Sequence, residues 1–118
     1  MGTFKVPIEV GNAERSRWER VEALVDTGSS ITSIPRSLWE SLGLTAEFRE
    51  SFMLADGRQA EYDVASAPIR IEGRERSTFV LAAEDESAPL LGAYTLEGFF
   101  LAPDPVNQKL IRVPGWRA

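Results

Sequence analysis

Residues 23–35 of the chain read ALVDTGSSITSIP, in which two apolar runs flank a short polar turn. The first run has the composition of a strand, and it delivers Asp26 into a turn rich in hydroxyl groups. Gly28 lets another backbone come close, while nearby hydroxyls and amides can hold the carboxylate oxygens. The turn therefore suits a rigidly held carboxylate, although Asp, Gly and Ser also form plain hairpin turns.

A second segment strengthens the first interpretation. Residues 89–100 read PLLGAYTLEGFF, an apolar-apolar-Gly sequence that leads into a short helix. Together with the Asp26-Thr27-Gly28-Ser29-Ser30 turn and the following Ile34-Pro35, it resembles the aspartic proteases, both the two-lobed pepsins and the small retroviral-type (retropepsin-like) enzymes. The resemblance covers residues 4–113 and implies a single-domain acid-protease fold, a closed β-barrel that acts as a homodimer.

The rest of the sequence has the pattern of an all-β domain. Apolar residues alternate over residues 4–10, and a further strand is expected over residues 17–25. Asp56-Gly57 and Glu72-Gly73 predict two hairpins, and residues 101–113 predict a third. Pro35 begins, and Gly43 ends, a predicted short helix with Trp39 in the core. We expect about eight short strands with one or two short helices.

The length of 118 residues allows one domain but not two catalytic lobes. We therefore predict a single domain over residues 1–118, with Pro114–Ala118 as a loose tail. Within that tail, Trp116 is either a free side chain or an anchor for an interface.

The chain contains no His and no Cys. This excludes Ser-His-Asp triads, Cys-His dyads, disulfides, and zinc sites built on imidazole or thiolate. Chemistry must come from carboxylates, hydroxyls, Lys, Arg or Tyr, and we expect no metal and no cofactor. The acidic residues 84–86 lack the spacing of a calcium loop and predict a solvated loop.

The net charge of −5 disfavours nucleic acid and anionic membranes as partners. Several arginines are interspersed with glutamates, which predicts a solvated surface of mixed charge; they include Arg15, Arg17, Arg20, Arg74 and Arg76. Neither a signal peptide nor an apolar stretch long enough to span a membrane is present in the sequence. These features predict a cytoplasmic protein.

Aspartic proteolysis needs two carboxylates that share one proton, yet the chain has one Asp-Thr-Gly sequence. Asp56, Asp63, Asp85 and Asp104 have no comparable setting. One domain with one such aspartate therefore implies a two-fold homodimer, in which each subunit supplies Asp26. The predicted function is that of an endopeptidase, a hydrolase whose substrate is a polypeptide.

The resemblance also implies a role for each residue of the turn. Asp26 is the catalytic acid or base, and Thr27 bonds across the two-fold axis. Gly28 lets the substrate or the partner turn approach, while Ser29 and Ser30 hold the carboxylate and the peptide main chain. Ser29 and Ser30 are as in pepsins, where most retroviral enzymes have Ala and then Asp, so retroviral substrate preferences do not transfer.

The same resemblance assigns the hairpin around Asp56-Gly57 to the flap that closes over bound peptide. Its predicted substrate-binding residues are Ala55, Asp56, Gly57 and Arg58, which differ from the glycine-rich flaps of retroviral enzymes. Polar and charged contacts with peptide are therefore expected there.

Two other functions remain open. The fold could serve as a catalytically quiet, dimeric peptide-binding or scaffold module, although a scaffold has no need of two carboxylates that repel each other. Alternatively, Asp26 could be the nucleophile of an aspartyl-phosphate enzyme, with Asp56 on Mg²⁺. That chemistry would call for alternating strands and longer helices around a parallel sheet.

Overall fold

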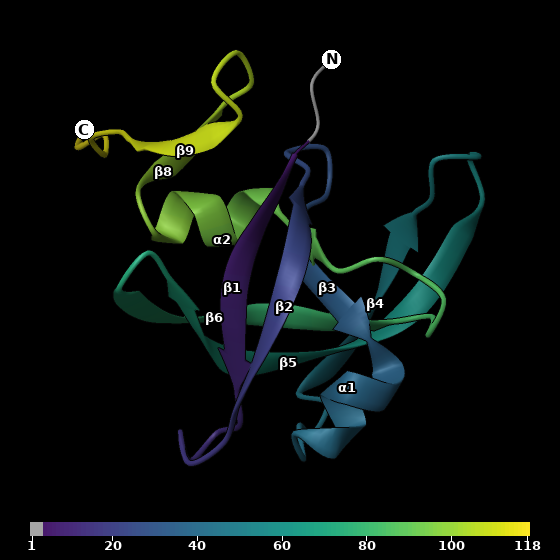
Figure 1. The fold of residues 1–118 in the computed structure, drawn as a ribbon. Helices are drawn as coiled ribbons and strands as arrows, with labels where there is room; N and C mark the ends of the chain where they lie inside the picture. Colours follow the sequence, from purple (N-terminus) through teal and green to yellow (C-terminus); the bar gives the residue numbers. More distant parts are fainter. Residues whose placement is uncertain (1–3) are drawn as a thin grey trace.

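The structure is a computed structural model that describes residues 4–118, so Met1 to Thr3 of the predicted domain lie outside it. Nine strands and two short helices make up this part of the chain (Figure 1). In order they are β1 (Lys5–Gly11), β2 (Trp18–Val25), β3 (Thr32–Pro35), α1 (Arg36–Ser41), β4 (Phe48–Met53), β5 (Gln59–Ile71), β6 (Arg74–Ala83), β7 (Leu90–Leu91), α2 (Ala93–Gly98), β8 (Leu101–Asp104) and β9 (Lys109–Arg112).

Seven of the strands form one sheet that closes on itself. Their order is β1-β2-β7-β3-β6-β5-β4, and a further pairing joins β1 to β5. Six strands thus complete a ring, and β4 extends it outside the ring on β5. Most pairings are antiparallel, but β2 with β7 and β3 with β6 are parallel. The predicted closed β-barrel with two short helices is confirmed.

The first strand follows its sequence pattern. Phe4, Val6, Ile8 and Val10 are all buried in the barrel core. β1 pairs with β2 along its whole length, but it meets β5 only at Glu9 and Val10. The other side of β1 is therefore free of a partner strand at Pro7, which has no N–H to offer, as predicted.

Both central hairpins turn where the sequence predicts. Gly57 and Gly73 have φ of 88° and 81°, a left-handed conformation that glycine adopts without a steric penalty. The strand between the two turns, β5, runs unbroken through all 13 residues. β4 pairs on one side of β5 and β6 on the other, and the two registers overlap at Val64. Pairing without a gap keeps β5 extended over its whole length.

Helix α1 packs against β3 and β6. Pro35 is its N-cap and the helix begins at Arg36, one residue later than predicted. Trp39 is buried, as expected, and its indole N–H donates to the carbonyl oxygen of Val80 at 3.3 Å. Gly43 follows the helix with φ of 68°.

The last two strands stand apart from the barrel as a separate two-stranded sheet. Figure 1 shows this β8–β9 hairpin (yellow) beyond α2, on the side of the molecule away from the β4–β5 hairpin (teal). Residues 113–118 have no regular secondary structure, and Trp116 is fully exposed. Within residues 4–118, neither helix is long and apolar enough to cross a membrane.

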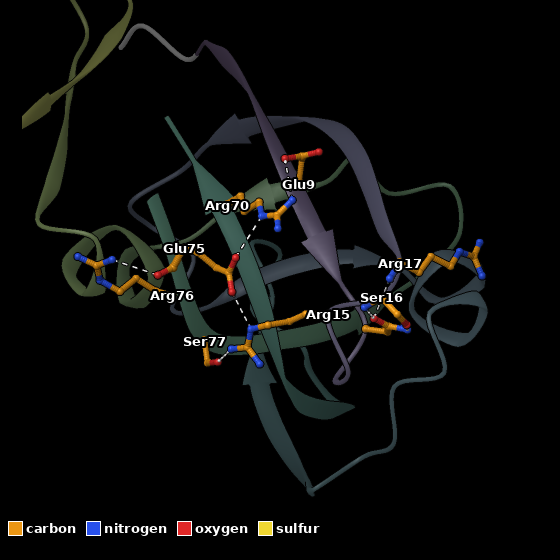
Figure 2. Close-up of polar contacts among 9 residues, drawn as sticks. Glu9, Arg15, Ser16, Arg17, Arg70, Glu75, Arg76 and Ser77 are labelled. Atoms are coloured by element: carbon orange, nitrogen blue, oxygen red, sulfur yellow. Dashed lines mark hydrogen bonds and ion pairs between the residues drawn. The ribbon is translucent and has the colours of Figure 1, made fainter. Parts of the chain in front are cut away.

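The predicted mixed-charge face is formed by β1, β5, β6 and the turn after β1 (Figure 2). Glu75 pairs with Arg15 at 2.6 Å and with Arg70 at 3.1 Å. The Arg70 guanidinium also lies 3.7 Å from the centroid of the Trp18 ring. We call this surface, defined by Glu9, Arg15, Trp18, Arg70, Glu75 and Ser77, the arginine face. Its charges are neutralised within the chain.

Candidate active site

Asp26 directly follows β2 and begins the turn that the sequence singled out. Its side chain is half-buried, and the N–H of Gly28 donates to its Oδ1 at 2.9 Å. The N–H of Ser29 donates to the Asp26 carbonyl at 3.1 Å. One carboxylate oxygen is therefore held by backbone, so the carboxylate has a fixed orientation.

Residues 89–100, the second segment that the sequence singled out, hold this turn in place by backbone hydrogen bonds. The N–H of Asp26 donates to the Leu91 carbonyl at 3.0 Å, and the N–H of Ala93 donates to the Ser29 carbonyl at 2.8 Å. Between them, a Cβ at Gly92 would collide with the carbonyl group of Ile31. The close approach of the two segments therefore requires glycine at this position.

Three buried threonines join the same two segments to each other and to β6. The hydroxyl of Thr95 lies 2.7 Å from that of Thr32 and 3.0 Å from that of Thr78. Thr32 also accepts the N–H of Gly92 at 3.1 Å. This network was not predicted, because its only local signal in the sequence is a hydroxyl-bearing residue at an otherwise apolar position. It ties the start of β3 to α2 and β6.

Asp26 faces a cleft of about 580 Å³ between its turn and the β4–β5 hairpin. The cleft is also lined by residues of the hairpin and of the loop after β6. The lining residues are Asp26, Gly28, Ser29, Ser30, Ser33, Phe52, Met53, Leu54, Ala55, Tyr62, Leu81, Ala83, Glu84, Ser87 and Leu90. A cleft of this size, apolar at its sides and with a carboxylate in its lining, can hold an extended segment of a few residues.

The predicted flap residues divide between the cleft and the tip of the hairpin. Ala55 lines the cleft, whereas Asp56, Gly57 and Arg58 form the turn beyond it. Arg58 donates its Nε–H to Asp56 at 2.7 Å, and its backbone N–H donates to the same carboxylate at 3.0 Å. The charged groups thus engage each other. The hairpin's other cleft residues, which were not among the predicted substrate-binding residues, are Phe52, Met53, Leu54 and Tyr62.

The base of the β4–β5 hairpin is fixed by an ion-pair cluster. Asp63 accepts from Arg36 of α1 and from Arg49 of β4, both at 2.9 Å. These two bonds hold the pKa of Asp63 below its ordinary value. They join the hairpin to α1, which positions its apolar residues over the cleft.

The hydroxyl groups of the turn are not arranged as expected around the carboxylate. Ser29 lines the cleft, but its hydroxyl donates to the Ile31 carbonyl at 3.2 Å instead of to Asp26. Ser30 also lines the cleft, and Thr27 is exposed at the surface of the turn. The reason is local, since the Ile31 carbonyl, two residues away, lies within reach of the Ser29 hydroxyl.

Residues 4–118 contain no group of three or more carboxylates placed to hold a metal ion. Asp85 of the acidic loop accepts the backbone N–H of Ser37 at 2.8 Å, in the first turn of α1. The chemistry available in the cleft is that of carboxylates, hydroxyls and backbone amides.

Comparison with known proteins gives a consistent result. The family model for aspartyl proteases matches residues 6–95. The solution structure of simian foamy virus (mac) protease aligns with a TM-score of 0.58 at 19% identity, covering 84% of this chain and 98% of its own. A retroviral protease-like domain of Ddi1 from Leishmania major aligns with a TM-score of 0.62 at 18% identity, covering 95% and 89%.

A retropepsin-like aspartic protease from Rickettsia conorii also aligns, with a TM-score of 0.58 at 18% identity, covering 87% of this chain and 77% of its own. At such identities these likenesses show the fold. A search of curated protein sequences gave no match.

Proposed function

The chain belongs to the aspartyl protease family, and from this premise we propose that it is an endopeptidase whose active site forms from two copies. The observation that carries the proposal is the position of Asp26, in a fixed orientation in a cleft under the β4–β5 hairpin. Residues 1–118 then act as one catalytic domain, with Pro114–Ala118 as a tail.

Two copies are needed because each chain offers the cleft a single aspartate from such a turn. A two-fold axis beside Asp26 would bring the two carboxylates together. They cannot both ionise cheaply at short range, so the pair retains one proton over an intermediate range of pH. Thr27, exposed next to Asp26, is suited to bond across that axis.

The proposed reaction follows from the shared proton. The ionised Asp26 takes a proton from a water molecule as the water oxygen bonds to the peptide carbonyl carbon. The protonated Asp26 gives its proton to the carbonyl oxygen. The Asp26 that took the proton from water then gives it to the amide nitrogen, while the other Asp26 takes a proton from one hydroxyl of the gem-diol intermediate. The C–N bond breaks, which leaves a carboxylic acid, an amine and the dyad with one proton again.

The remaining residues position the substrate. Ser29 and Ser30, which line the cleft, offer polar groups to the peptide main chain, and Gly28 leaves room for it. Ala55 contacts peptide from the hairpin, while Asp56, Gly57 and Arg58 form the tip that closes over it. A polypeptide substrate, a cytoplasmic location, and the lack of cofactor and nucleic-acid partners remain predictions from the sequence.

The test is cleavage of denatured casein over a range of pH, with molecular mass in solution measured in parallel. We expect cleavage by the dimer at acidic to neutral pH, inhibition by pepstatin, and loss of cleavage in Asp26→Asn. A folded dimer that cleaves at no pH would favour the quiet peptide-binding module. A strict monomer that cleaves would overturn the shared-dyad mechanism.

A further inference from the structure

One corner of the cleft combines aromatic rings with a carboxylate. Tyr62 of β5 donates its hydroxyl proton to Oε2 of Glu84 at 2.6 Å. On the neighbouring strand, the ring of Phe52 meets Tyr62 edge-on, with centroids 6.1 Å apart. All three side chains line the same cleft as Asp26. An apolar aromatic wall therefore ends at a negative charge.

The loop that carries Glu84 is held on both sides. The N–H of Ser87 donates to the Glu84 carbonyl at 3.0 Å, which closes a tight turn after β6. The next residue, Asp85, is bound to the backbone of Ser37 in α1. Because Asp85 is engaged outside the cleft, Glu84 is the carboxylate that this loop presents to it.

Glu84 remains ionised in weakly acidic solution. Its hydrogen bond from Tyr62 holds its pKa below the ordinary value, and the same bond raises the pKa of Tyr62. Its side-chain partners are the hydroxyls of Tyr62 and Ser87, not a cation. Among the described residues that line the cleft, none is Lys or Arg. The positive charge of Arg58, at the hairpin tip, also lowers the pKa of Glu84, but Arg58 forms its ion pair with Asp56.

We infer that this corner is a subsite for a lysine or arginine side chain of the substrate. The aliphatic stem and the cation would lie along Phe52 and Tyr62, since such side chains pack well on aromatic rings. The cationic head would reach Glu84, which lacks a cationic partner. The inference rests on the proposed function, because it gives the peptide that Asp26 would cleave a preferred composition.

Binding tests the inference separately from cleavage. Asp26→Asn protein would be titrated with fluorescein-labelled, unstructured peptides of one apolar core sequence. Each peptide carries lysine, norleucine or glutamate at one position, and that position is moved along both sides of the core. Because a two-fold dimer has two such corners, we expect one position on each side of the core at which lysine binds about three- to tenfold more tightly than norleucine, with glutamate weakest. The size follows from one ion pair in a partly wet cleft.

Variants identify the group responsible. Glu84→Gln keeps an oxygen for Tyr62 but removes the charge, so the lysine-to-norleucine ratio should fall to about one. Glu84→Lys should reverse the order and favour glutamate. The matched control is Glu86→Gln, which removes a charge from the same loop at a residue that does not line the cleft. It should keep the ratio of the parent protein.

The outcomes separate the two proposals. Lysine preference that is lost in Glu84→Gln supports the subsite, and it does so even if the parent protein cleaves no peptide, which would overturn only the endopeptidase. Equal binding of lysine and norleucine at every position would overturn the subsite. So would a lysine preference that survives in Glu84→Gln. If the parent protein cleaves peptides but binds lysine no better than norleucine, the endopeptidase proposal is supported and the subsite is overturned.

Discussion

The arginine face and the cleft hold their charges in different ways. On the arginine face, Glu75 lies between Arg15 and Arg70, at 2.6 and 3.1 Å, and each cation has a carboxylate of the same chain (Figure 2). In the cleft, Asp26 is held by the backbone N–H of Gly28 and Glu84 by the hydroxyl of Tyr62. The first surface completes its ion pairs, and the second orients carboxylates without neutralising them.

This difference separates structural charge from charge that is available to a ligand. A paired surface carboxylate contributes little, because solvent and salt screen it. A carboxylate held by neutral donors has a defined direction and no cation of the same chain beside it. The cleft, and not the larger number of charges on the arginine face, is where substitution should affect chemistry.

The strongest test exchanges one carboxylate from each region for its amide. Asp26→Asn should lower the rate of peptide hydrolysis by about 10²–10⁴-fold, because the amide cannot take the proton of water. Its thermal midpoint should stay close to that of the parent, since an amide oxygen can still accept from Gly28. Glu75→Gln should retain hydrolysis. Both rates are measured on the same peptide. An equal loss of hydrolysis in Glu75→Gln and Asp26→Asn would contradict the distinction between the arginine face and the cleft.

The site itself can be broken without touching a carboxylate. Gly92→Ala should lower the free energy of unfolding by about 3 kcal/mol, since the new methyl group collides with the Ile31 backbone, which cannot move easily. The collision should also displace the turn that carries Asp26, so the rate of peptide hydrolysis should fall. Urea denaturation measures the effect, and Gly98→Ala is the control, because nothing lies within 4 Å of a Cβ there. Equal losses in both variants would contradict this account.

The threonine network should have a smaller effect. Thr95→Val removes the hydroxyl that joins Thr32 to Thr78 and leaves both without that partner in the core. We expect a loss of about 2 kcal/mol in the free energy of unfolding. Thr95→Ser keeps the hydroxyl and should retain more of the stability than valine does. If serine were as damaging as valine, the methyl group and not the network would matter.

Local chemistry explains what the sequence could predict. The Asp26 turn and the hairpins at Gly57 and Gly73 depend on neighbouring residues, and all are found where expected. The pairing of Tyr62 with Glu84 joins residues 22 apart, and Thr32 with Thr95 joins residues 63 apart. Such contacts depend on how the strands are paired, which no local pattern encodes.

The β4–β5 hairpin shows the same limit. Its location follows from the Asp56-Gly57 signal, but which of its residues lie over the cleft depends on the direction of the strands leading to the turn. Asp56 and Arg58 engage each other at the tip, and the apolar Phe52, Met53 and Leu54 line the cleft instead. Charge at a hairpin tip was thus a poor guide to the cleft lining.

The smallest effect concerns the pH dependence of the arginine face. Hydrogen bonds from Arg15 and then Arg70 lower the pKa of Glu75. A carboxyl whose pKa is lower in the folded state adds stability that is complete above its unfolded value, about pH 4.5, and is lost as pH falls through the folded value. Glu75→Gln should therefore differ from the parent slightly at neutral pH, and less in strong acid or high salt. Urea midpoints at both pH values measure this difference. If it were the same at both, the ion pairs of the arginine face would not be its cause.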